Sequence, residues 1–228
     1  MRSSRRALLL ALTLAIVGGG GSLVASELSF PEHGFSLNLP GDWQIGDQSI
    51  VEDMNAMMKA DPRTSKVQYY RIIYPSSPDP DKNLFPTYIL VQIVDSPISP
   101  ELFAKLFPSI ARGVVRGAQQ ATDIIKDVVN MDVTVGKPVY DPETRTGLTA
   151  FSGVDEDGSK FKAMSVSIPT TKNVICLHVY ADETKADAVF PEVVPTLQVA
   201  SLQREVAMTD DWNAAIEKLL KTKTVGED

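Results

Sequence analysis

The sequence predicts a mixed α/β fold of the α+β type, in which an antiparallel β-sheet is flanked by helices. Three observations predict it. Runs of alternating apolar and polar residues, typical of strands with one buried face, become dense in the second half of the chain. Apolar residues at helical spacing form separate stretches between and after these runs. The chain has 228 residues, of which 43% are hydrophobic and 22% charged, as expected for one globular domain with short appendages.

The first expected elements are a strand, a turn and an amphipathic helix. Residues 34–39 alternate apolar and polar side chains, and Trp43 begins a return segment after a Pro-Gly-Asp turn. A helix is expected over residues 49–60, because Ser49 and Glu52 have the spacing of a capping box. Its expected apolar stripe consists of Ile50, Met54, Met57 and Met58.

A hairpin and a second helix follow. Residues 67–74 and 87–94 are rich in β-branched and aromatic side chains, so they are expected to pair across a proline-rich loop, residues 75–86. The next helix starts at Pro100, a residue type that is favoured in the first helical turn. Pro108 is expected to kink this helix or to divide it in two. The expected buried stripe consists of Leu102, Leu106, Phe107, Ile110 and Val114.

From Ile124 onward the chain is expected to be rich in strands. An Asp-Gly pair ending at Gly158 suits the tight connection of a hairpin. Residues 186–197 have helical spacing, which Pro191 and Pro195 interrupt. The candidate strands are residues 128–135, 146–154, 160–168 and 173–180.

The N-terminus has the layout of a secretory signal peptide. Arg2, Arg5 and Arg6 form a positive segment, and an uncharged run follows them. Small residues at the end of that run suit cleavage after Ala25 or Ser26. The alternative is an uncleaved anchor, because the roughly 19 uncharged residues approach the ~20 that are needed to cross a bilayer. A glycine run within the segment favours cleavage.

These features divide the chain into a signal peptide (1–26), an α/β domain (27–203), and a C-terminal amphipathic helix and tail (204–228), with export to the periplasm or the cell exterior. Loss of the signal removes three arginines and no acid, so the formal net charge falls from −7 to about −10. Such a surface repels nucleic acid and anionic lipid, so membrane contact is expected only through an uncleaved N-terminus. Cys176 is the single cysteine, which excludes an intramolecular disulfide.

Residues 209–221 are expected to form a helix that carries the candidate binding site. Its apolar stripe could insert into a groove of a partner protein, or it could dock onto its own domain. The loop 75–86 is a second candidate, since it is long enough for a recognition element, although a plain connection is equally compatible with its sequence. The candidate binding residues of the helix are Trp212, Ile216, Leu219 and Leu220.

Two stretches resemble the Mog1/PsbP-like family. Residues 34–43 are similar to the family's strand, Pro-Gly turn and tryptophan, with the sequence GFSLNLPGDW. Residues 147–202 are similar to its terminal strand–turn–strand–strand–helix stretch, with residues 173–180 in the strand before the last helix. The resemblance spans residues 30–202 and implies an antiparallel sheet within an α/β/α sandwich. It also implies action through protein contacts and no enzyme chemistry.

Cys176 and His178 are the pair that comes nearest to a catalytic motif. In a strand their side chains point to one face about 7 Å apart, whereas a nucleophilic site needs the thiol and the imidazole within hydrogen-bond reach. A small buried cysteine and a hydrogen-bonded core histidine are therefore expected instead. His33 is expected at the surface.

No metal or cofactor site is expected. The acidic group of Asp155, Glu156 and Asp157 lacks the closing glutamate of a calcium loop. The methionines of the first helix could ligate Cu(I), but their spacing is that of a core stripe. The chain contains no G-x-S-x-G, H-E-x-x-H or phosphate-loop motif. No catalytic residue, metal ligand or cofactor is therefore assigned.

Together these expectations favour a non-enzymatic extracytoplasmic protein that binds an envelope protein, as an accessory or assembly factor of an envelope complex. The alternative is a small-ligand carrier or sensor with a pocket between the sheet and the helices. A weak hydrolase is the third hypothesis, and it would require titratable groups with shifted pKa values in a cleft.

Overall fold

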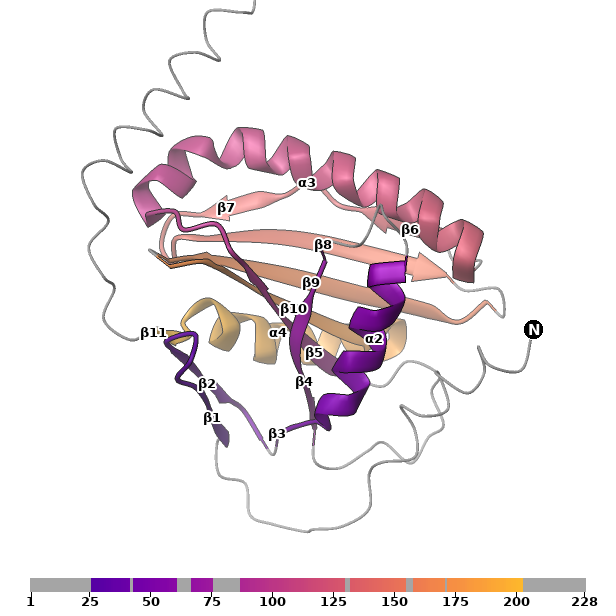
Figure 1. Ribbon diagram of the computed structural model, residues 1–228, viewed down its shortest axis with the longest axis horizontal. Helices are drawn as coiled ribbons and strands as arrows, with labels where there is room; N and C mark the ends of the chain where they lie inside the picture. The colour runs from indigo at the N-terminus through magenta and orange to yellow at the C-terminus, as the bar shows by residue number, and fades with distance from the viewer. Residues whose placement is uncertain are drawn as a thin grey trace, which may run out of the picture.

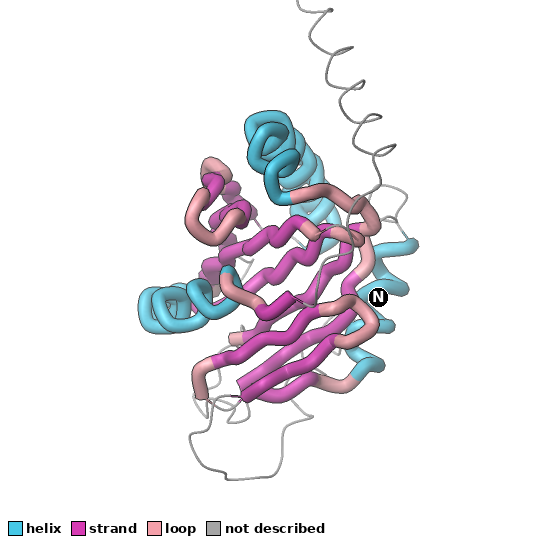
Figure 2. Tube along the Cα trace, turned by 90° about the vertical axis from the view of Figure 1, so that its left-hand side faces the viewer, coloured by secondary structure: helices cyan, strands magenta, loops and turns pink. Residues whose placement is uncertain are grey.

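Two antiparallel sheets and three helices make up the part of the chain that the computed structural model describes, namely residues 26–41, 43–60, 67–75, 87–129, 132–154, 158–170 and 172–202. Figure 1 shows the long helix α3 running along one side of the larger sheet, and Figure 2 shows helices on both sides of that sheet. The predicted α+β fold, an antiparallel sheet flanked by helices, is confirmed. None of the described helices has the length and apolarity of a membrane span.

The larger sheet has eight strands. Its order is β3-β4-β5-β10-β9-β8-β6, and β7 pairs with the end of β8 that β6 leaves free. The strands are β3 (Trp43–Ile45), β4 (Tyr69–Pro75), β5 (Tyr88–Val94), β6 (Asp132–Val135), β7 (Val139–Asp141), β8 (Thr146–Val154), β9 (Lys160–Pro169) and β10 (Val174–Asp182). Five strands of this sheet, β4, β5, β8, β9 and β10, were predicted to within two residues, because hydrophobic alternation is a local property of the sequence.

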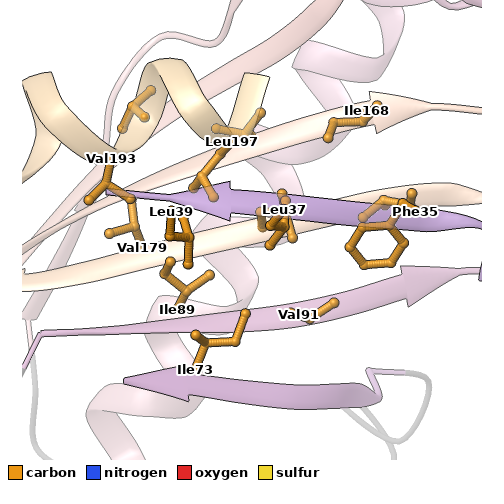
Figure 3. Close-up of a cluster of buried hydrophobic side chains, with 14 of the residues drawn as sticks. Phe35, Leu37, Leu39, Ile73, Ile89, Val91, Ile168, Val179, Val193 and Leu197 are labelled. Carbon is orange, nitrogen blue, oxygen red and sulfur yellow. The ribbon is translucent and has the colours of Figure 1, made fainter. Parts of the chain in front are cut away.

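A small sheet and helix α4 (Glu183–Gln198) cover one face of the larger sheet. The small sheet has the order β1-β2-β11, with β1 at Ser26–Phe30, β2 at Phe35–Leu39 and β11 at Ser201–Leu202. Figure 3 shows Leu37 and Leu39 of β2 between Leu197 of α4 and the apolar side chains of β5. These side chains are almost fully buried and form the main core.

Helix α2 (Gln48–Ala60) packs onto the other face, over β4. Its start differs from the predicted capping box, because the Asp47 carboxylate accepts the Ser49 backbone N–H at 2.9 Å and Ser49 therefore lies inside the helix. Val51 is the fully buried residue of α2. Met57 was predicted to lie in the core stripe, but it is 53% exposed, so that part of the prediction is wrong. The Asn55 carboxamide bonds to both backbone groups of Tyr69 at 2.7 Å, which seals the outer edge of β4.

Helix α3 (Pro100–Val129) is longer than predicted. It continues through Pro108 without a break, and it includes residues 128 and 129, which were expected to begin a strand. Helix α4 likewise contains Pro191 and Pro195. In both helices, anchoring of apolar side chains against the sheet outweighs the loss of single backbone hydrogen bonds at proline, as tertiary packing often does for local propensity.

The rings of Phe103 and Phe107 anchor α3 at Gly147 of β8. A Cβ atom on Gly147 would lie 2.6 Å from Cε2 of Phe107, whereas one on Gly113, in the same helix, would meet no atom within 4 Å. Gly147→Ala is therefore expected to lower the free energy of unfolding by about 1–2 kcal/mol. Gly113→Ala is expected to raise it by roughly 0.5 kcal/mol, because alanine is the better helix former.

Urea unfolding of the two glycine variants checks this packing. The double variant Gly147→Ala/Phe107→Leu should lose less stability than the sum of the single variants, since the smaller side chain removes the clash. Equal, small effects at both glycines would contradict the position of α3 on β8.

Candidate functional site

Helices α2 and α3 lie on the same face of the larger sheet, over opposite ends of its strand order, so the central strands lie between them. The main contacts of α2 are with β4, and those of α3 are with β6 and β7. Strands β9 and β10 have their main helix contacts with α4, which lies on the opposite face. The face between α2 and α3 presents side chains of β5, β9 and β10, and the rings of Tyr88 and Tyr180 there pack against the buried cluster around Val51 of α2.

The residues of this face follow from strand alternation and register. Along β10 the odd-numbered residues 175–181 are buried in the main core, while the even-numbered residues stay partly accessible. Register places Gln92 of β5 and Ser167 of β9 beside Cys176, and Ser165 beside His178. We call this set the sheet-face site; its members are Tyr69, Tyr88, Gln92, Ser165, Ser167, Cys176, His178 and Tyr180.

His178 holds the centre of the site through a chain of hydrogen bonds. Its Nε2 lies 3.1 Å from Oε1 of Gln92, and its Nδ1 lies 2.6 Å from Oγ of Ser165. Because a carboxamide oxygen can only accept, Nε2 carries the proton and donates it to Gln92. Nδ1 of the neutral ring is then an acceptor, and the Ser165 hydroxyl donates to it.

Desolvation keeps this centre uncharged. It lowers the pKa of His178 to about 4, and it raises the pKa of the Cys176 thiol to about 11 despite the Ser167 hydroxyl 3.8 Å away. Both side chains are largely buried but retain some accessible surface. The expected hydrogen-bonded histidine is confirmed, and the thiol and the imidazole each bond to a serine of β9 rather than to each other.

Three partly buried tyrosines lie on the same face and pack against the cluster around Val51 of α2. The rings of Tyr88 and Tyr180 stack with centroids 4.8 Å apart, and the ring of Tyr69 stands edge-on to His178 at 6.3 Å. Desolvation raises the pKa of all three hydroxyls, and each tyrosine is close enough to another ionisable group of the site to raise it further. No hydrogen bond joins these three hydroxyls to another described residue.

The site as a whole is polar but carries no charge. Among the described facing positions of β5, β10, β9 and β8, the one charged residue is Asp182 at the end of β10, whose carboxylate caps α4 by accepting the Thr184 backbone N–H. Within the described ranges, no three His, Cys, Asp or Glu side chains gather as a metal ion would require. Aromatic rings with a few hydrogen-bonding groups are the usual lining of a site for a small uncharged molecule.

The predicted binding residues cannot be placed on this site. Trp212, Ile216, Leu219 and Leu220 lie outside the described residues, as do the signal peptide up to Ala25, the loop 76–86, and the acidic group Asp155, Glu156 and Asp157. His33 is described and is half-buried rather than exposed, because its ring stands edge-on to Tyr70 at 4.3 Å. Burial is also the main cause of its lowered pKa.

Gln92, Ser165, Ser167 and the three tyrosines were not predicted as site residues. The alternation of Ser165 and Ser167 with Val166 and Ile168 signalled one polar and one apolar face of β9. That signal predicts which residues share a face, but the neighbours across the sheet depend on register.

Comparison with known proteins adds a likeness of fold. The sequence matches no protein-family model and no curated protein sequence. The solution structure of cyanobacterial PsbP (CyanoP) from Synechocystis sp. PCC 6803 is similar over 83% of this chain and 99% of that chain, with 11% identity and a TM-score of 0.46. This likeness is the one that the sequence predicted, and it concerns the fold alone.

A second solved structure is similar in the same way. LpqN of Mycobacterium tuberculosis, described as involved in cell envelope biogenesis, matches over 79% of this chain and 91% of its own, with 14% identity and a TM-score of 0.40.

Proposed function

We propose that this chain is an exported, non-enzymatic protein that binds a small uncharged molecule in the sheet-face site between α2 and α3. One observation carries the proposal: the central strands present a largely buried but partly accessible set of aromatic and polar side chains, the sheet-face site, whose members carry no charge. Three tyrosine hydroxyls there have no protein partner among the described residues. A ligand would supply hydrogen bonds to them and would stack on their rings.

The direction of the pKa shifts favours binding over catalysis. A general base works best with a pKa near the working pH, and a nucleophilic cysteine needs a lowered pKa. Here the pKa of His178 is lowered to about 4 and that of Cys176 is raised to about 11, which makes the first a poor base and the second a poor nucleophile. The same desolvation would disfavour a charged ligand.

The exposed surface gives less support to a protein partner. A protein-binding surface usually forms a contiguous apolar patch. In the described part of the chain the exposed large apolar side chains come from separate elements: Ile45, Met57, Val94, Val139, Val154 and Val199. Binding of an envelope protein through Trp212 and its neighbours, or through the loop 75–86, therefore stays a prediction from the sequence. Export also rests on the sequence of the N-terminus, whose predicted cleavage site adjoins the start of β1 at Ser26.

A dye titration tests the proposed function. Nile red is a flat, uncharged dye whose fluorescence increases in apolar surroundings. We expect residues 26–228 to bind it, and we expect Tyr180→Leu to weaken binding at least about tenfold, because the variant loses ring stacking and a hydroxyl. Val199→Asp is the control: Val199 is 66% exposed, and its substitution should leave the affinity unchanged.

Circular dichroism and a thermal melt would establish that both variants are folded. Loss of binding in Val199→Asp with full retention in Tyr180→Leu would place the dye on the outer surface and would contradict the proposal.

A further inference from the structure

Strands β6, β7 and β8 carry α3 on one face and no described helix on the other. Helix α4 lies on that other side of the sheet, but its main contacts are with β9 and β10. The even-numbered residues of β8 point to this side, because Leu148 packs against the main core and Thr146 bonds to Gln198 of α4. We call the uncovered strip the open face; its members are Thr134, Val139, Leu148, Ala150, Ser152, Val154 and Met164.

The open face is uncharged and largely exposed. Val139 is 56% exposed and Val154 is 39% exposed, and the members in the middle of β8 and β6 are exposed as well. The charged side chains on its borders are engaged with α4: Lys162 pairs with Asp187 at 3.1 Å, and Asp141 accepts a hydrogen bond from the last turn of the helix. A solvated sheet face normally carries polar side chains, so this mainly apolar strip is suited to a cover.

The described chain ends close to this strip. The Gln198 carboxamide donates to Oδ2 of Asp141 at 2.8 Å and to Oγ1 of Thr146 at 3.1 Å, which fixes the end of α4 at the first residue of β8. Strand β11 follows and ends at Leu202; it pairs with β2, which packs over β5, three strand spacings or roughly 14 Å from β8. Residues 203–208 can span up to about 20 Å, which is enough to reach β8.

We infer that residues 209–221 dock as a helix on the open face, beside α4. The stripe that the sequence predicts for this helix, Trp212, Ile216, Leu219 and Leu220, then lies against β8 and its neighbours. A helix of this length is about 20 Å long, and the nine residues of β8 extend over about 30 Å, so the strand accommodates it. The inference is independent of the proposed function, whose site lies on the opposite face of the sheet.

The size of the open face favours the chain's own segment over a separate partner. Only five of its members are apolar, whereas a stable interface between free proteins takes about 20–30 residues from each side. A segment joined to the domain by a short linker binds at an effective concentration in the mM range, so a small contact suffices. The stripe is then occupied, and a partner protein would have to displace it from the sheet.

Fluorescence quenching by acrylamide tests the docking. The chain has two tryptophans and Trp43 is buried in the main core, so the signal of Trp212 is the difference between each protein and its Trp212→Phe variant. We expect Trp212 of residues 26–228 to be protected. Ala150→Glu places a carboxylate beneath the helix, and it is expected to shift the docking equilibrium at least about tenfold toward the undocked state and to raise the quenching of Trp212.

Ile45→Glu is the matched control, because Ile45 is a 41% exposed strand residue at the opposite edge of the sheet. Its quenching should equal that of the unaltered protein, and circular dichroism establishes that both glutamate variants are folded. Equal quenching in the unaltered protein and in Ala150→Glu would overturn the inference, as would an equal rise in both glutamate variants. Protection that disappears on dilution, with a dimer in analytical ultracentrifugation, would assign the stripe to a second copy and overturn docking within one chain.

Discussion

Replacing Leu197 with alanine is expected to lower the free energy of unfolding by about 2–5 kcal/mol. Leu197 is fully buried in the last turn of α4, where it packs against the small sheet and the larger sheet together. The smaller side chain loses this apolar contact and leaves a cavity that the rigid strands around it cannot fill. A loss of this size is a large share of the 5–15 kcal/mol that is usual for a domain.

Urea unfolding followed by circular dichroism measures this loss. Val199→Ala is the matched control, because Val199 lies two residues further along the chain and is 66% exposed. We expect its effect to stay within about 0.5 kcal/mol. A loss below about 1 kcal/mol for Leu197→Ala would contradict the position of α4 over the main core.

The second large effect is a dependence of stability on pH that His178 causes. Its pKa in the folded protein is lowered from 6.5 to about 4, so between these two values the unfolded chain binds a proton that the folded chain does not. Stability therefore rises with pH through this window and is lost as the pH falls from about 6.5 to 4. The shift corresponds to a loss of up to about 3 kcal/mol at pH 4.

The variant His178→Gln isolates this effect, because glutamine can bond to Gln92 or Ser165 but does not titrate in this range. Unfolding free energies of both proteins are measured from pH 7.5 to 4. His33 contributes equally to both curves, and Asp47 and Asp141, whose pKa values are lowered, lose their contribution at lower pH. Parallel curves for the two proteins would show that His178 is not desolvated and would contradict its buried position in the site.

The sequence predicts the strands of this fold better than its helices. Strands β8, β9 and β10 were found almost to the residue, because each alternates buried and accessible side chains along its own length. Strand β1 was missed, although Leu28 and Phe30 alternate with polar residues there. Pro108, Pro191 and Pro195 were expected to interrupt α3 and α4, but both helices continue through them. Packing against the sheet outweighs the low helix propensity of proline, which is all that the sequence alone indicates.

The candidate site could not have been assembled from the sequence. His178 was identified as a hydrogen-bonded residue, but its partner Gln92 lies 86 positions away along the chain. The register between β5 and β10 brings the two together, and register depends on the whole sheet. The grouping of Tyr69, Tyr88 and Tyr180 has the same origin, since the three residues come from three neighbouring strands.

The central claim is that an uncharged ligand binds between α2 and α3, and ¹⁹F NMR of protein labelled with 3-fluorotyrosine tests it most directly. All six tyrosines of the chain are in described residues, and their signals can be assigned with single Tyr→Phe variants. On addition of Nile red, the signals of Tyr69, Tyr88 and Tyr180 are predicted to shift. Those of Tyr70, which packs against Phe30 on the opposite face, and Tyr140, which packs beneath α3, are predicted to stay in place. Shifts confined to Tyr70 or Tyr140 would contradict a ligand site on this face of the sheet.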